Sequence, residues 1–239
     1  MAEREIQAAQ GTPDGPARPA AVPVPAIEEA GRQLRAPWAA GVAGLLFSAL
    51  FTAALLLLRI PANRSDILQR FASGEDLAIV IGGMYLAPFA GIMFLWFVAV
   101  IRDQIGERED RFFATVFFGS GLLFVALLFA AAAVVSTPAA AVQFMGQAPL
   151  SAEAVGLLRA LAYTLLFAFA TRGAAVFMIA AATIGIRSGV FPRWFALTGY
   201  LLGVVLLVAV SFADWFILVL PAWVAVVSLF ILRRERARR

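Results

Sequence analysis

Long apolar stretches without charge follow one another along the chain, and their lengths predict its architecture. Six stretches make up most of the sequence: residues 36–58, 77–101, 112–152, 160–186 with Arg172 as the one interruption, 194–213 and 215–232. A helix needs about 20 apolar residues to cross the hydrocarbon core of a bilayer, which is about 30 Å thick. The pattern therefore predicts an all-α polytopic membrane protein built as a bundle of six transmembrane helices.

Arginines flank these stretches unevenly, and this asymmetry predicts the orientation of the bundle. Positive charge is retained on the cytoplasmic side of membrane spans. If the amino terminus lies in the cytoplasm, fourteen arginines fall in cytoplasmic segments and four outside, while Arg172 lies within the bilayer. We therefore expect both termini in the cytoplasm. The exclusive use of arginine and the many alanines indicate a GC-rich bacterial genome, so the expected location is the bacterial cytoplasmic membrane.

The chain divides into a transmembrane domain, residues 37–232, and two tails. Residues 1–36 are rich in proline and alanine and form no apolar face, which predicts a flexible cytoplasmic tail. Residues 233–239 form a basic cytoplasmic tail. Between the spans, Ser65 can cap a short interfacial helix. A second outer connection is expected over residues 138–150, followed by a long helix that begins at Ser151 with Glu153 in its first turn.

Composition removes most catalytic chemistries. Apolar residues make up 62% of the chain, all nineteen basic residues are arginine, and histidine, cysteine and lysine are absent. Imidazole acid–base chemistry, thiolate nucleophiles, Schiff bases and ordinary zinc sites therefore have no residues to carry them. We expect no enzymatic activity, no metal and no cofactor. Because the arginines flank membrane spans, the expected partners are membrane lipids and other membrane-protein subunits, not nucleic acid.

One intramembrane charge suggests a ligand site. Arg172 lies about 22 Å along its helix from Arg187, hence roughly 8 Å below the outer boundary of the hydrocarbon core. An arginine at this depth needs a partner, water or lipid headgroups. Asp214 lies within reach at the start of the last span, and Tyr85 comes at about the same depth. These three residues predict a pocket for an anionic ligand. In the alternative reading, Arg172 only snorkels to the interface or makes one structural ion pair.

Prolines and glycines predict how the helices bend and pack. Proline removes a backbone hydrogen bond, so Pro88 and Pro221 are expected to kink the second and sixth spans. Small residues four apart allow two helices to approach closely in a membrane. Gly199 and Gly203 have this spacing in the fifth span, and Gly41, Gly44 and Ser48 form a similar strip in the first.

Two stretches resemble a known group of proteins. Residues 185–203, GIRSGVFPRWFALTGYLLG, and residues 106–124, GEREDRFFATVFFGSGLLF, are similar to bacterial six-helix integral membrane proteins without an assigned activity. The resemblance covers residues 40–232 and implies the fold and the inner-membrane location. It implies no activity and no site residues.

The sequence thus predicts a non-catalytic accessory, structural or interaction protein of the inner membrane. The alternative is a small-molecule or lipid transporter that uses an outer-leaflet pocket around Arg172. An intramembrane enzyme fits least well, because the spans contain no acidic residue away from their ends.

Overall fold

A computed structural model describes residues 37–59, 80–105, 111–187, 189, 192–208 and 214–237, and all secondary structure in these ranges is helical. Seven α-helices are present in this part: α2 (Pro37–Arg59), α5 (Ala87–Ile105), α6 (Arg111–Gln143), α7 (Ala152–Tyr163), α8 (Thr171–Arg187), α9 (Arg193–Val208) and α10 (Val219–Arg236). Three further helical segments adjoin them: the π-helices η1 (Val80–Leu86) and η3 (Thr164–Ala170), and the 3-10 helix η4 (Asp214–Leu218).

Five helical stretches are long and apolar enough to cross a membrane. They are Trp38–Leu58, Gly82–Arg102, Phe112–Gln143, Ala152–Arg187 and Phe216–Arg236. The fourth stretch joins α7, η3 and α8 into one continuous helix of 36 residues. Helix α9 is apolar but has only 16 residues. The prediction of an all-α, multi-pass membrane protein is confirmed at this level.

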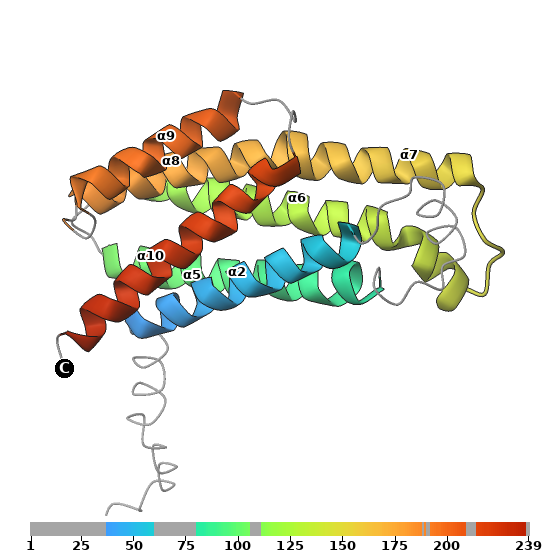
Figure 1. Cartoon of the computed structure of the whole chain (residues 1–239), viewed down its shortest axis with the longest axis horizontal. Helices are drawn as coiled ribbons and strands as arrows, with labels where there is room; N and C mark the ends of the chain where they lie inside the picture. The colour runs from blue at the N-terminus through green and yellow to red at the C-terminus, as the bar shows by residue number, and fades with distance from the viewer. Residues whose placement is uncertain are drawn as a thin grey trace, which may run out of the picture. The chain divides into compact units, whose positions relative to one another are not determined.

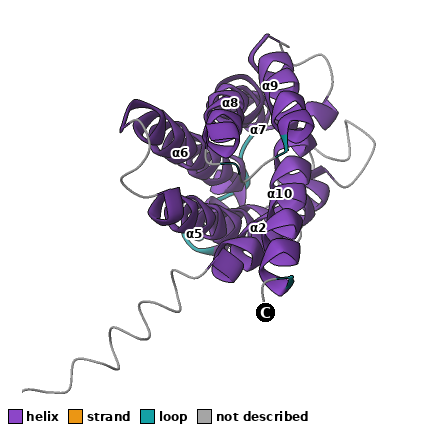
Figure 2. Ribbon diagram, turned by 90° about the vertical axis from the view of Figure 1, so that its left-hand side faces the viewer, coloured by secondary structure: helices purple, strands orange, loops and turns teal. Residues whose placement is uncertain are grey.

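The helices pack side by side in an order that Figure 2 shows from one end. Helix α2 packs against α5 and α10, α6 packs against α5 and α8, and α9 packs against α8. Rings from α9 and α10 also meet, since Phe195 lies 5.1 Å from Phe230 between ring centroids. Consecutive long helices run in opposite directions (Figure 1). As a result, α2, α6 and α9 begin, and α5, α8 and α10 end, at the same end of the bundle. We call it the arginine-rich end, because it carries Arg102, Arg111, Arg187, Arg193, Arg233, Arg234 and Arg236.

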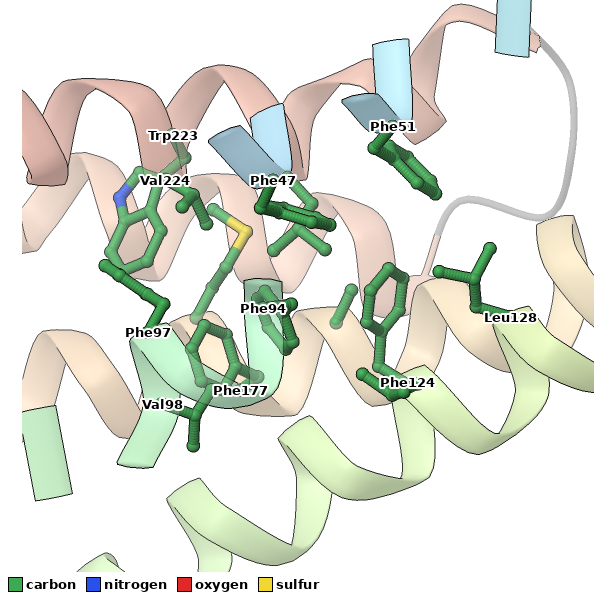
Figure 3. Packing of buried hydrophobic residues seen from close by; sticks show 14 of the residues in the cluster. Phe47, Phe51, Phe94, Phe97, Val98, Phe124, Leu128, Phe177, Trp223 and Val224 are labelled. Carbon is green, nitrogen blue, oxygen red and sulfur yellow. The ribbon is translucent and has the colours of Figure 1, made fainter. Parts of the chain in front are cut away.

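Phenylalanine rings fill the middle of the bundle (Figure 3). Phe94 of α5 lies 4.7 Å from Phe47 of α2, 5.2 Å from Phe124 of α6 and 4.9 Å from Phe177 of α8, measured between ring centroids. All four are buried. Phe51 extends this group, one helical turn beyond Phe47. These five residues are called the aromatic cluster below. They meet because each helix places an aromatic residue on its inward face at the same height, where tilted ring pairs are favourable.

The glycines singled out by their spacing lie in contacts between helices. A Cβ atom on Gly44 would come within 2.1 Å of Ser228 Oγ, and one on Gly41 within 2.6 Å of the Leu232 side chain, both on α10. On α9, a Cβ on Gly203 would lie 2.7 Å from Ile179 of α8. Gly199 lies between Ala182 of α8 and Trp223 of α10, with its Cβ position 3.2 and 3.3 Å from them. Close backbone approach is therefore possible only without a side chain at these positions.

The connection expected over residues 138–150 is shorter in the structure, and that prediction was wrong in its first part. Helix α6 continues through Pro138 and ends at Gln143. A proline inside a helix removes one backbone hydrogen bond, and the hydrogen bonds on both sides can keep the helix in place. The start of the next helix is confirmed, because Ser151 Oγ accepts a hydrogen bond from the Ala154 amide at 3.3 Å and Glu153 lies in the first turn.

Both predicted kink prolines lie where the type of helix changes. Pro88 is the second residue of α5 and follows the π-helix η1, and Pro221 is the third residue of α10 and follows the 3-10 helix η4. Each proline lies inside a continuous helical run, so the carbonyl one turn before it receives no hydrogen bond from the proline, and the change of helix type occurs at this point. Helix α10 also continues to Arg236, past the boundary drawn at residue 232. The amino-terminal tail and the segment around Ser65 lie outside the described residues.

Candidate ligand-binding cavity

A cavity of about 460 Å³ lies in the half of the bundle away from the arginine-rich end. Six elements form its wall, each with at least one residue: Leu55 of α2, Ala87 of α5, Leu128 of α6, Arg159 of α7, Leu166 of η3 and Ile217 of η4. We call it the Arg159 cavity. Its volume falls within the range of small-molecule sites, about 300–1,000 Å³.

The aromatic cluster closes the inner end of the Arg159 cavity. Phe51 lines the cavity and also stacks on Phe47 at 5.4 Å, with its edge contact to Phe124 at 5.9 Å between ring centroids. The cavity is open at Leu56 and Tyr163, which line it while 51% and 38% of their surfaces remain exposed. The cavity is thus a recess that opens on one side and ends on packed phenylalanine rings.

Two polar side chains line the cavity among the described residues, and both come from α7. Arg159 is half-buried, and Tyr163 lies one turn further along the same helix and stacks on Phe167 at 4.3 Å. The remaining described wall is aliphatic or aromatic. Arg159 is 28 residues from Arg187, a rise of about 40 Å along the continuous helix. A bilayer including its headgroups is about 40–45 Å thick. Arg159 would therefore lie at headgroup level when Arg187 lies at the opposite surface.

The π-helix η3 shapes one wall of the cavity, and side chains of α8 supply hydrogen bonds to its carbonyl groups. Thr171 Oγ1 donates to the Phe167 carbonyl at 2.5 Å, and an Arg172 guanidinium nitrogen donates to the Ala168 carbonyl. Both acceptors lie within η3. π-Helical turns are rare and occur frequently at functional sites. Arg172 thus donates a hydrogen bond to the backbone of the π-helix that lines the cavity.

Of the three residues predicted to form a pocket, Arg172 and Tyr85 have described side chains, and neither lines the Arg159 cavity. Arg172 is half-buried but lines neither of the two cavities described here. Tyr85 belongs to η1 and 53% of its surface is exposed. The Asp214 backbone begins η4, whereas its side chain lies outside the described residues. A ligand site made of these three residues stays a prediction.

A second cavity of about 590 Å³ lies between α6 and the junction of η1 with α5. Gly83, Met84 and Pro88 form one side, and Phe129 and Ser136 of α6 form the other. The Ser136 hydroxyl is buried and has no hydrogen-bond partner among the described groups. The Ser136 hydroxyl has room because residue 83 is glycine, since a Cβ atom at that position would lie only 2.2 Å from Ser136 Oγ. Pro88, predicted only as a kink, therefore also lines a cavity.

Arg159 is one of the four arginines that the sequence places outside the cytoplasm, and its position there predicts only a charge that flanks a span. A signal for its role was present, since Arg159, Tyr163, Leu166 and Ala170 follow the spacing of one helix face. That face joins a charge to an apolar stripe. The pattern does not reveal that the opposite helices leave space in front of it, which depends on packing.

Comparisons of the chain with family models, with curated proteins and with solved structures give no match. The resemblance to bacterial six-helix membrane proteins therefore stays a prediction.

Proposed function

We propose that the chain is an integral protein of the bacterial cytoplasmic membrane with a non-catalytic accessory or structural role, packing against lipids and other membrane-protein subunits. The aromatic cluster carries this proposal, because its rings occupy the middle of the bundle. Transporters bind their substrates near the middle of the membrane. An intramembrane enzyme needs polar groups with room for a substrate. A middle packed with phenylalanine rings instead favours a rigid scaffold.

We propose that the chain crosses the membrane six times, with α9 as the fifth span. Helix α9 runs antiparallel along α8, since Gly199 faces Ala182 and Gly203 faces Ile179. Its rings also meet those of α10. Sixteen residues rise about 24 Å, which is shorter than the hydrocarbon core of about 30 Å. A short span is accommodated by local thinning of the bilayer at a modest cost.

The proposed orientation places the arginine-rich end and both termini in the cytoplasm. Cysteine labelling tests it directly, because the chain contains no cysteine and single ones can be introduced without other changes. Gln147→Cys, in the exposed connection after α6, should react with a membrane-impermeant reagent in intact cells. Arg193→Cys, exposed at the start of α9, should react only after the membrane is opened. The reverse pattern, or a periplasm-active reporter that works at the carboxyl terminus, would contradict the orientation.

Flux measurements and cross-linking test the accessory role. Proteoliposomes that contain the chain alone should take up small carboxylates or phosphate no faster than empty liposomes. Leu201→Cys, on the exposed side of α9 with 64% of the leucine surface accessible, should cross-link in native membranes to one defined membrane-protein subunit. Saturable uptake by the chain alone would overturn the accessory role in favour of a transporter.

A transporter that uses Arg172 is the second candidate, and the half-buried guanidinium within a long apolar stretch favours it. If Arg172 pairs with Asp214, the double change Arg172→Ala with Asp214→Ala should recover stability relative to either single change. If Arg172 binds an anionic ligand, Arg172→Ala alone should abolish stabilisation by that ligand, and Asp214→Ala should not restore it. Thermal unfolding in detergent, with and without anionic lipid, distinguishes the two outcomes.

A further inference from the structure

We infer that the Arg159 cavity binds a single-chain amphiphile with an anionic headgroup, its alkyl chain in the apolar recess and its headgroup on the guanidinium of Arg159. The inference rests on the membrane location proposed above but not on the accessory role. It concerns a different place from Arg172, and the ligand class follows from the wall, the depth and the charge of the recess.

The wall selects an apolar occupant. A void of about 460 Å³ leaves its lining atoms without dispersion partners on one side, so the protein is more stable when something fills it. Water needs two to four polar partners in a buried site, and apolar cavities stay dry. The described wall offers polar groups only at Arg159 and Tyr163, both on the side of α7. Alkyl chains match the rest of the surface, including Leu55, Leu128 and Leu166.

The depth selects a short or medium chain. The cavity wall runs from Phe51 to Leu58 on α2 and from Leu128 to Val135 on α6, a rise of about 10 Å in each case. One leaflet of the hydrocarbon core is roughly 15 Å thick. The aromatic cluster blocks further penetration, since Phe51 at the bottom packs on Phe47. A chain shorter than a full leaflet fills the recess, whereas the two long chains of a phospholipid would extend beyond it.

The charge selects the headgroup. Arg159 lies at headgroup level, about seven residues or 10 Å from Leu166 at the deeper part of the wall. A guanidinium carries five hydrogen-bond donors in a fork that matches carboxylate and phosphate oxygens. Arg159 interacts with another group of the protein, and a guanidinium with five donors can engage more than one acceptor at a time. Carboxylate and phosphate share the required chemistry, and the competitors below separate them.

Photolabelling of the full chain in phosphatidylcholine nanodiscs tests the inference. The probe is a fatty acid with a photoreactive group near the end of its chain, which should label the deep wall around Leu128 and Leu166. An unlabelled fatty acid or alkyl phosphate of the same length should compete, and whichever acts at the lower concentration identifies the headgroup. The matching alkylamine should compete at least about tenfold less well, because a cation cannot pair with Arg159. Labelling elsewhere, or equal competition by the amine, would overturn the inference.

Matched variants test separately the contribution of the Arg159 charge and that of the cavity volume. Arg159→Gln should weaken competition by the fatty acid about tenfold but leave the corresponding alcohol unchanged, whereas Arg159→Lys should retain most of the affinity. Arg187→Gln is the control for charge, because Arg187 lies at the far end of the same continuous helix and lines neither cavity. Ala162→Phe should fill the recess and abolish labelling, and Ala160→Phe, exposed on α7, should not.

The inference fails if Arg159→Gln binds the fatty acid like the unaltered chain, or if Ala162→Phe still labels the deep wall. Size-exclusion chromatography and thermal unfolding identify variants that have lost their fold, and Arg159→Lys then carries the comparison. The cysteine labelling described above reports topology independently. A chain with the proposed topology that fails to bind the probe would therefore contradict this inference alone.

Discussion

Two buried hydroxyl groups in the contact between α2 and α10 have different surroundings. Ser48 Oγ lies 2.8 Å from both the Gly44 carbonyl of its own helix and the Pro221 carbonyl of α10. With one hydrogen, it donates to one of them at a time. Ser228 Oγ is fully buried and has no hydrogen-bond partner among the described groups. Only the first hydroxyl can join the two helices by a hydrogen bond.

Replacing each serine by alanine should reveal this difference. Ser48→Ala removes the donor to α10 and should destabilise the bundle by about 0.5–1.5 kcal/mol. Ser228→Ala removes a buried polar atom without a partner and should be neutral or stabilising. Thermal unfolding in a mild detergent compares the two variants. An equal loss of stability in both would show that Ser228 forms a hydrogen bond of its own.

Gly44 gives a second test at the scale of single residues. Gly44→Ala would place a Cβ atom 2.1 Å from Ser228 Oγ and 2.8 Å from the Phe97 ring. Overpacking of this kind typically costs about 1–3 kcal/mol. Gly119→Ala is the matched control, because nothing lies within 4 Å of its Cβ position on α6, and alanine favours a helix. The melting temperature should fall for Gly44→Ala and stay equal or rise for Gly119→Ala.

Single residues differ in how far the sequence reveals them. The spacing of Gly41, Gly44 and Ser48 predicts a strip for close helix contact, and the structure places the strip against α10. The role of Arg159 was not predicted, because a charge at the end of an apolar run has the same pattern whether or not a cavity lies beside it. A cavity is a property of the facing helices, and no local signal records it.

At the scale of elements, the irregular helices matter most for the candidate site. The π-helix η3 and the 3-10 helix η4 both line the Arg159 cavity, and Ala87 lines it directly after η1. A π-turn changes the direction in which the following side chains point, because its hydrogen bonds span one residue more than those of an α-helix. The side chains from Arg159 to Leu166 face the cavity at the spacing of one helix face, and the π-turn shifts the register of the side chains that follow it on α8.

Thr171 tests whether side-chain donors hold η3 in this form. Thr171→Val removes the hydrogen bond from Oγ1 to the Phe167 carbonyl while nearly preserving shape. We expect faster amide hydrogen exchange over η3 and less photolabelling at Leu166. Thr137→Val is the control, because the Thr137 hydroxyl donates to Ala133 within the regular, exposed part of α6. Unchanged exchange in Thr171→Val would mean that packing alone maintains the π-turn.

The sequence predicts regular helices better than their interruptions. Ser151 and Glu153 mark the start of α7 correctly, because a cap is a local interaction. Pro138 suggested a connection, yet α6 continues to Gln143. A proline inside a helix removes one backbone hydrogen bond and often bends the helix without ending it, so Pro138 alone does not mark the boundary. The π-turn of η3 has no sequence signature at all.

At the scale of the whole molecule, the lengths of the apolar stretches predict the all-helical architecture that the structure describes, whereas the orientation stays a prediction. Because the helices alternate in direction, arginines of five helices lie at the same end of the bundle. This is the end that we expect in the cytoplasm. The number of spans depends on α9, whose 16 residues lie below the length usual for a span. Its packing against α8 and α10 is tertiary information, which explains why length alone gives five spans and the pattern of apolar runs gives six.

The two halves of the bundle differ in packing, and they should therefore differ in compressibility. One half is packed with phenylalanine and resists compression as protein interiors do, whereas the half around the Arg159 cavity has volume to lose. Hydrostatic pressure favours states that eliminate such voids. Ala131→Phe, which fills the cavity from α6, should therefore lower the sensitivity of unfolding to pressure, and Ala126→Phe, exposed on the same helix, should not. A change in lateral pressure within the membrane would act on the same half first, so the soft half is where the bilayer can deform this protein.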